Sequence, residues 1–323
     1  MIIKKNMQFN SRYWKILSVK FQKSITLFLL VLFLFTLISC NDENNNEYEP
    51  KFTSPPNQVN EYIFGVHPLH NPKRLQEIFG PLIDYLTEKI PNVIFRLEAS
   101  RNYAAFDKKL YEGKFHFALP NPFQTVNSLD HNYHVFGKMS DDKNFRGIII
   151  LRKDSKIKSI KELKGKAISF PAPTALAATM MPQYYLEMNG IEVMKDIDIK
   201  YVGSQESSIM SVYLGNTDAA STWPPPWLAL IKERPELDEE LEVKWETKPL
   251  INNGLVVRND VSKKILEQVS ELILNLHTHP KGRLWLERME LSKFEKANDE
   301  TYSVVIEFLK KFNREVREIN FKK

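Results

Sequence analysis

Short apolar runs alternate with longer amphipathic segments along most of this chain. The first run, at 62–66, fits one buried strand, and the segment after it places Leu75, Ile78, Phe79, Leu82, Ile83 and Leu86 on one helical face. Further strands are expected at 93–97, 115–119, 133–138, 147–151, 167–170, 199–202, 219–222, 242–247 and 255–258, with helices between and after them up to 316. This alternation predicts an α/β fold with mostly parallel sheets covered by helices on both faces.

The length of the chain indicates more than one lobe. At 323 residues it exceeds what a single core comfortably fills, and two α/β halves of similar order are visible without a sequence repeat. In open α/β sheets, ligands bind beyond the carboxyl ends of the strands. A cleft between the two halves is therefore the expected site.

The basic charge of the chain is confined to its N-terminus. The formal net charge is +5, but residues 1–39 hold six basic side chains and no acid, which leaves 39 basic against 40 acidic side chains elsewhere. A nucleic-acid partner is therefore not expected.

The same N-terminus has the pattern of an export signal. A basic segment precedes an apolar run at 25–39 that is too short for a typical membrane span, and Leu37-Ile38-Ser39-Cys40 resembles the lipobox of bacterial lipoproteins. We expect a signal peptide at 1–39, a lipid on Cys40, a disordered tether at 40–59 and a location on the extracytoplasmic face of a bacterial membrane. An uncleaved anchor helix is the alternative, and translation could begin at Met1 or Met7. Cys40 is the only cysteine, so an intramolecular disulfide or thiolate cluster is excluded.

One strand, turn and helix in the middle of the chain suit ligand binding. The strand Ala167–Phe170 leads through two prolines to Thr174, the expected N-cap of a helix at 175–189 that Gly190 ends. The first N–H groups of such a helix can receive an anionic or polar group. An ordinary structural βα unit is the alternative.

Several short segments stand in the order and spacing of a known family. From 62 to 258 the chain resembles the solute-binding subunits of phosphate, phosphite and phosphonate ABC importers, which have the type II periplasmic binding protein fold. The segments are Phe64-Gly65 with Pro68 and Pro72, then 81–86, 103–106, 152–155, 160–166, the strand-turn-helix with Pro182, 203–206, 215–220 and 256–258.

This resemblance implies two Rossmann-like lobes, at 60–147 plus 250–323 and at 148–249, joined by hinge strands near 147–151 and 247–254. The lobes would close over a small solute and present it to an ABC permease. A sensing module that signals to a membrane kinase is the alternative. A monomer without cofactor or metal is expected, and no motif of an enzyme active site was found.

The resemblance also indicates candidate ligand-binding residues. These are Tyr103, Asn121, Thr174, Ala175, Leu176, Gln205, Glu206, Trp223 and Trp227. Trp227 also fits a core position, and Glu206 fits the first turn of a helix near Ser207. His67 and His70 lie on the first turn, where exposed loop residues are expected and a metal site is not.

The chain departs from the family where the ligand is held. Ala175-Leu176-Ala177-Ala178 stands in place of a Ser-Thr-Ser-Gly run, Gln205 in place of a histidine and Pro120 in place of a tyrosine. Hydroxyl donors are lost, while Trp223 adds an aromatic surface. We therefore expect weak binding of inorganic phosphate and simple alkylphosphonates, and a preference for a small zwitterion or organic acid.

Overall fold

The computed structural model describes residues 60–319. The predicted signal peptide at 1–39, the lipidation site Cys40 and the tether at 40–59 lie outside the described residues. Within 60–319, none of the helices combines the length and the apolar character needed to span a membrane.

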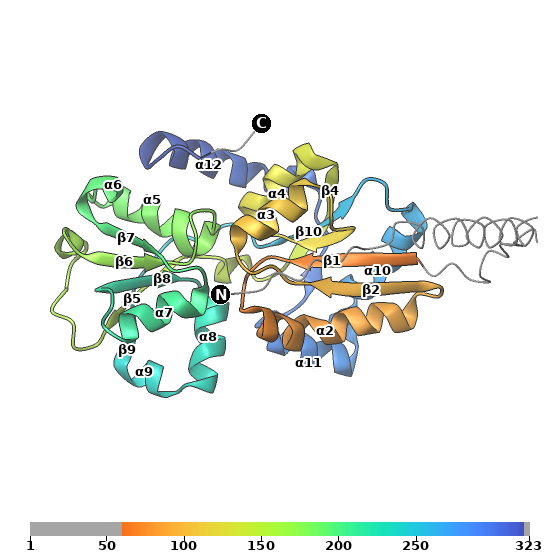
Figure 1. Ribbon diagram of the computed structural model, residues 1–323, viewed down its shortest axis with the longest axis horizontal. Helices are drawn as coiled ribbons and strands as arrows, with labels where there is room; N and C mark the ends of the chain where they lie inside the picture. Colours follow the sequence, from red (N-terminus) through yellow and green to blue (C-terminus); the bar gives the residue numbers. More distant parts are fainter. Residues whose placement is uncertain (1–59, 320–323) are drawn as a thin grey trace, which may run out of the picture. The chain divides into compact units, whose positions relative to one another are not determined.

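A six-stranded sheet contains the first strands of this region (Figure 1). Its order is β11, β4, β10, β3, β1, β2. The strands are β1 (Asn60–Val66), β2 (Val93–Glu98), β3 (Phe117–Leu119), β4 (Tyr133–Met139), β10 (Gly254–Arg258) and β11 (Phe294–Glu295). Strand β1 runs parallel to β2 and β3, whereas β10 runs antiparallel to β3 and β4.

A five-stranded sheet is formed by the middle of the chain, in the order β7, β6, β8, β5, β9. The strands are β5 (Ile148–Arg152), β6 (Ala167–Phe170), β7 (Asp198–Tyr201), β8 (Ala219–Thr222) and β9 (Leu241–Glu246). Side chains of β5 alternate between two apolar clusters, Ile149 and Leu151 in one and Ile148 and Ile150 in the other. This period of two buries both faces of the sheet.

Helices cover both faces of each sheet, as the sequence predicts. Figure 1 shows α2 and α11 on one face of the six-stranded sheet and α3 and α4 on the other. The helices are α2 (Pro72–Lys89), α3 (Tyr103–Tyr111), α4 (Pro122–Ser128), α5 (Met181–Met188), α6 (Val193–Asp196), α7 (Gln205–Tyr213), α8 (Pro224–Glu233), α9 (Glu236–Glu240), α10 (Lys263–Leu274), α11 (Pro280–Arg288) and α12 (Ser303–Glu315). Helix α2 illustrates the cause, because Asn71 caps it, Pro72 begins it, and Leu75, Phe79 and Leu82 lie on its buried face.

The prediction of mostly parallel sheets is wrong. Five of the nine strand pairings are antiparallel. Strand β4 leads to β5, and β9 leads to β10, without an α-helix between them. These connections carry the chain from one sheet to the other, so β5 and β10 enter their sheets without a crossover helix and run antiparallel to their neighbours.

The chain passes between the two sheets at these two connections, which run side by side. Thr247 N donates to Gly147 O at 2.9 Å, and Leu250 N donates to Phe145 O at 2.9 Å. A Cβ on Gly147 would lie 2.5 Å from Ala177 O, so only glycine fits this close approach.

The predicted helix at 175–189 begins differently from the expectation. Its first turn is a π-helix, Leu176–Met180, and regular α-helix follows at α5. The N-cap position belongs to Ala175, which has no capping side chain, so the prediction of Thr174 as N-cap is wrong. Ala175 has an extended backbone directly before the wide π-turn, which gives it the N-cap position.

Candidate functional site

A small cavity lies between the segments that follow the strands of the two sheets. Its volume is about 10 Å³, which is room for about one water molecule. Side chains beside the six-stranded sheet that line it are His67, Tyr103, Asn121, Phe145 and Asn253. The part of the chain that forms the five-stranded sheet contributes the other lining residues, which are Ala175, Leu176, Ala177, Ala178, Gln205 and Trp223.

A chain of hydrogen bonds crosses this cavity. Thr222 Oγ1, at the end of β8, donates to Gln205 Oε1 at 2.7 Å, and Gln205 Nε2 donates to Tyr103 OH at 3.1 Å. Gln205 is the first residue of α7, whose N-cap is Ser204. Burial raises the pKa of Tyr103 far above its ordinary value, so the phenol keeps its proton. Because Tyr103 already accepts from Gln205, its own O–H remains a donor for a ligand.

Asn121 holds two parts of the site together. As the N-cap of α4, its Oδ1 accepts from Gln124 N at 3.1 Å, and its Nδ2 donates to Thr174 O at 3.0 Å. Thr174 does not line the cavity itself. Its backbone is fixed from the opposite side, which positions Ala175 and Leu176 at the cavity wall.

An ionisable carboxyl lies directly behind this contact. Asp107 on α3 accepts from Gln124 Nε2 at 2.5 Å. Burial raises the pKa of Asp107 to about 6, although hydrogen bonds from Gln124 and the Thr174 hydroxyl partly oppose that shift.

The two predicted tryptophans lie in different places. Trp223 lines the cavity, is 2% exposed and meets the Phe145 ring edge-on at 5.3 Å between centroids. Trp227 packs in the apolar cluster of Ile148, Ile209 and other residues on one face of the five-stranded sheet. The structure therefore does not bring Trp227 to the cavity wall.

Glu206 lies outside the cavity and joins an interaction between helices. Asn71 Nδ2 donates to Glu206 Oε2 at 2.8 Å, and Arg74 Nη1 lies 3.7 Å from Glu206 Oε1. The same Arg74 nitrogen contacts Glu233 Oε2 of α8 at 2.9 Å. Glu206 is thus paired in this conformation with groups from α2.

The expectation of His67 and His70 as exposed loop residues is wrong. They are 2% and 5% exposed, and burial lowers the pKa of His67 to about 4 and that of His70 to about 3. The turn after β1 folds inward, so His67 Nδ1 lies 2.9 Å from Leu119 O at the end of β3. His67, Phe145 and Asn253 were missed as site residues. Their position just after strands or within the crossing connections is the signal that could have found them.

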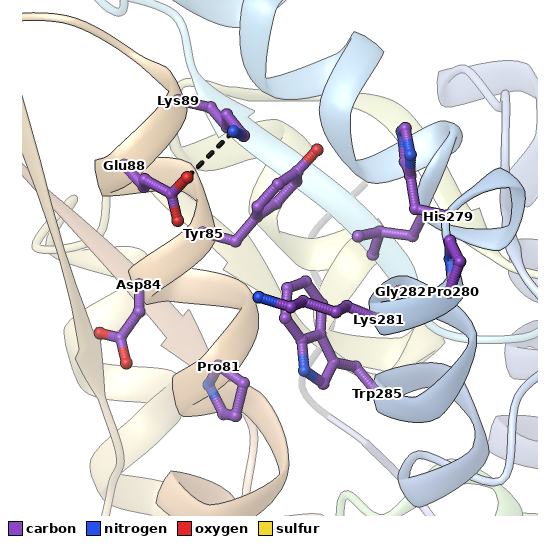
Figure 2. A pocket seen from close by; sticks show the side chains of 11 residues that line it. Pro81, Asp84, Tyr85, Glu88, Lys89, His279, Pro280, Lys281, Gly282 and Trp285 are labelled. Carbon is purple, nitrogen blue, oxygen red and sulfur yellow. Dashed lines mark hydrogen bonds and ion pairs between the residues drawn. The ribbon is translucent and has the colours of Figure 1, made fainter.

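A much larger groove lies elsewhere, between α2 and α11 (Figure 2). Its volume is about 710 Å³, and the rings of Tyr85 and Trp285 lie 5.4 Å apart within it. Charged side chains such as Asp84, Glu88 and Lys281 surround these rings at the open surface. It contains none of the predicted site residues, so the small cavity between buried side chains is the better candidate.

Over the described residues 60–319, no three His, Cys, Asp or Glu side chains cluster in a way that could hold a metal ion. The groups at the cavity are hydroxyl, amide, imidazole and aromatic. Their chemistry is recognition of a small polar molecule by hydrogen bonds and ring contacts.

Comparison with known proteins identifies the family. The model of the family described as ABC transporter, phosphonate, periplasmic substrate-binding protein matches residues 64–302. The chain belongs to this family. It is a substrate-binding component of the ABC transporter type, and the predicted type II periplasmic binding protein fold of two α/β lobes is confirmed.

Individual members of the family are distant in sequence. A probable ABC transporter phosphite-binding protein of Prochlorococcus marinus is 26% identical over 204 residues, 59% of this chain and 67% of that protein. Its structure with methylphosphonate has a TM-score of 0.72 at 21% identity, over 79% of this chain and 99% of that one. A binding component of a Pseudomonas aeruginosa phosphonate transporter has a TM-score of 0.73 at 18% identity, over 79% and 87% of the two chains.

Proposed function

We propose that this protein captures a small, singly charged organic acid in the cavity and presents it to the permease of an ABC importer. The observation that carries the proposal is the uncharged wall of the cavity. Among residues 60–319, those lining it include no Lys, Arg, Asp or Glu. Burial of a charge without a partner charge is costly, and the cost grows with the number of charges. A monoanion or a zwitterion therefore suits this wall better than a dianion.

Membership of this family makes phosphonates the first class of ligand to consider. One relative is named as a phosphite-binding protein, and its structure contains methylphosphonate. In this chain, Ala175, Ala177 and Ala178 offer no hydroxyl to such a group. We therefore infer that phosphate and simple alkylphosphonates bind more weakly here than they would at a hydroxyl-lined wall, and that contact with Trp223 contributes to affinity.

The placement of the protein in the cell envelope belongs to the same proposal. We infer lobes at 60–147 plus 250–323 and at 148–249, a division supported by the membership of β5 to β9 in one sheet. The lipobox-like sequence before Cys40 favours a lipid-anchored protein on the extracytoplasmic face. Loss of fatty-acid labelling in Cys40→Ala would support the anchor, and unlabelled wild type would exclude it.

A ligand panel tests the solute assignment. We expect the purified protein from residue 41 onward to be stabilised by small organic acids or zwitterions, because a ligand that binds only the folded state raises the melting temperature. Calorimetry then gives the affinity of each hit, with phosphite, phosphate and methylphosphonate in the same series. If no member of the panel binds, the proposed function is wrong.

A further inference from the structure

Two residues that line the cavity carry a hydrogen-bond acceptor with no donor among the described residues. The first is a ring nitrogen of His67. Its Nδ1 lies 2.9 Å from Leu119 O. A carbonyl oxygen can only accept, so Nδ1 carries the proton of the neutral ring and Nε2 is left with a lone pair. No hydrogen bond joins Nε2 to another residue of the described region 60–319.

The second acceptor belongs to Asn253, in the connection between β9 and β10. Its Nδ2 lies 3.4 Å from Met139 Sδ. A thioether sulfur accepts but does not donate, which fixes the amide with its nitrogen toward the sulfur. Asn253 lines the cavity and is fully buried, and within residues 60–319 its Oδ1 has no hydrogen-bond partner. A buried carbonyl without a donor costs free energy unless a ligand supplies one.

Tyr103 provides the complementary group at the same cavity. Its hydroxyl accepts from Gln205, so its proton is free for an acceptor on the ligand. A ligand that addresses these groups therefore needs an acceptor for Tyr103 and at least one donor for His67 or Asn253. A small acid that keeps one proton offers both kinds of group: one O–H that can donate to His67 Nε2 or to Asn253 Oδ1, and further oxygens that can accept from Tyr103.

We propose that His67 and Asn253 select solutes whose acid group retains a proton, and disfavour those that present only acceptor oxygens. The inference rests on the proposed function, because it assigns the charge state of the solute bound at the same cavity. A fully deprotonated oxyanion would place oxygen lone pairs against the two lone pairs of His67 Nε2 and Asn253 Oδ1, which is repulsive.

Protonation of His67 would reverse its role, so its surroundings matter. The nearest ionisable groups are His70 on the same turn and Tyr103 on α3, whose ring centre lies 6.1 Å from that of His67. Beyond them, Arg74 on α2 acts on His70, Asp107 acts on Tyr103, and Glu206 on α7 pairs with Arg74. Arg74 and His67 both lower the pKa of His70, and burial lowers the pKa of His67 to about 4. His67 therefore stays neutral at the pH values used below.

Three small acids test whether the protein recognises the retained proton of its ligand or only the negative charge. Methylphosphonate carries an O–H below its second ionisation and none above it. Its monomethyl ester and methanesulfonate carry a single charge without an O–H. We expect methylphosphonate, well below its second ionisation, to bind at least about tenfold more tightly than either control and to weaken as that proton is lost. Calorimetry at one pH well below and one pH well above this second ionisation measures the difference in affinity.

The other outcomes overturn the inference. Methanesulfonate binding within about threefold of methylphosphonate would show that charge alone is recognised. Tighter binding of methylphosphonate above its second ionisation would contradict it too, as would the failure of all three probes to bind. In that last case the proposed function stands if another acid or zwitterion of the panel binds, and fails with the inference if none does.

A variant assigns the effect to the imidazole. His67→Gln places an amide that can donate as well as accept, so the ratio of methylphosphonate to methanesulfonate affinity should fall clearly below its wild-type value, with Asn253 still selecting. The exposed His279→Gln is the matched control and should keep the wild-type ratio. Should His67→Gln fail to fold, Asn253→Asp serves instead: its carboxylate repels both monoanions but can still accept the O–H of methylphosphonate, so the affinity ratio should rise. An unchanged ratio in a folded variant overturns the inference.

Discussion

Arg317 donates a hydrogen bond of 2.6 Å from Nη2 to the carbonyl oxygen of Pro173. Its Nε also donates to Gln183 Oε1 at 3.2 Å, and its guanidinium lies 5.1 Å from the centre of the Phe312 ring. Helix α12, which precedes Arg317, contacts both α4 and α5. The C-terminal segment therefore connects α4, which packs on the six-stranded sheet, to the loop that leads into the cavity wall.

Arg317→Ala should weaken solute binding. The contact to Pro173 holds the loop that leads into the cavity wall, so its loss should loosen that wall. Hydrogen bonds to a charged group contribute about 1.5–3 kcal/mol, and for this partly exposed pair we expect a loss of about tenfold in affinity. Calorimetry with the best ligand of the panel measures it. Arg314→Ala removes an exposed pair with Glu315 and is the control. Equal affinity of the two variants would contradict the prediction.

Trp223→Ala and Trp227→Ala should differ in what they lose. Truncation of a buried tryptophan typically costs about 3–5 kcal/mol of unfolding free energy, and Trp227 lies wholly within an apolar cluster. Trp227→Ala should therefore unfold more easily while its folded fraction binds normally. Trp223→Ala should lose solute affinity in addition, because its ring lines the cavity. Chemical denaturation and calorimetry on both variants decide this, and normal binding by Trp223→Ala would remove Trp223 from the site.

Ala175→Ser should increase the affinity for alkylphosphonates. The serine returns a hydroxyl to the cavity wall, and one hydrogen bond to a charged group is worth about 1.5–3 kcal/mol, or roughly ten- to a hundredfold in affinity. Ala172→Ser lies in the same loop but does not line the cavity, so it is the matched control. If both variants bind methylphosphonate like the wild type, the missing hydroxyls are not what limits its binding.

Asp107→Asn should change how stability depends on pH. The pKa of Asp107 is raised by burial from 3.8 to about 6, so the folded state favours the neutral carboxyl. The stability contributed by the neutral carboxyl is fully present below the pKa of Asp107 in the unfolded state, and it is lost as the pH rises through about 6. The cost of ionisation at neutral pH is then about 3 kcal/mol.

The variant Asp107→Asn keeps a side-chain oxygen that can accept from Gln124 Nε2, but its side chain cannot ionise. Its unfolding free energy should thus exceed that of the wild type at about pH 7 and approach it at about pH 4. Asp130→Asn at an exposed position is the control and should show no such gain. Urea titrations over this range make the comparison, and a constant difference between variant and wild type would refute the pKa argument.

The individual elements could be predicted better than their arrangement. Strand β8 (Ala219–Thr222) was expected at its observed bounds, because a short apolar run between turn residues leaves little choice. The antiparallel direction of β10 could not be predicted from its own residues. It follows from the connection that crosses from one sheet to the other, and apolar periodicity carries no information on such a crossing.

The candidate site was predicted only in part for a similar reason. Tyr103, Asn121, Ala175, Leu176, Gln205 and Trp223 were expected near the ligand, and the structure brings them to or beside one cavity. The burial of His67 could not be predicted, because a polar residue directly before a proline usually indicates an exposed turn. Its hydrogen bond to Leu119 O depends on β3, some fifty residues away. Sequence patterns describe neighbours along the chain, and such a contact is set by the sheet.

A cavity with room for about one water molecule has a kinetic consequence. A solute cannot diffuse into it while the surrounding side chains stay together, so every capture must follow an opening of the protein. We expect the observed binding rate to rise with solute concentration and then level off at the opening rate, instead of rising without limit as for an exposed pocket. Release must wait for the same event. The time for which the protein holds its cargo is thus governed by how often it opens, and a permease that favours the open form would shorten it.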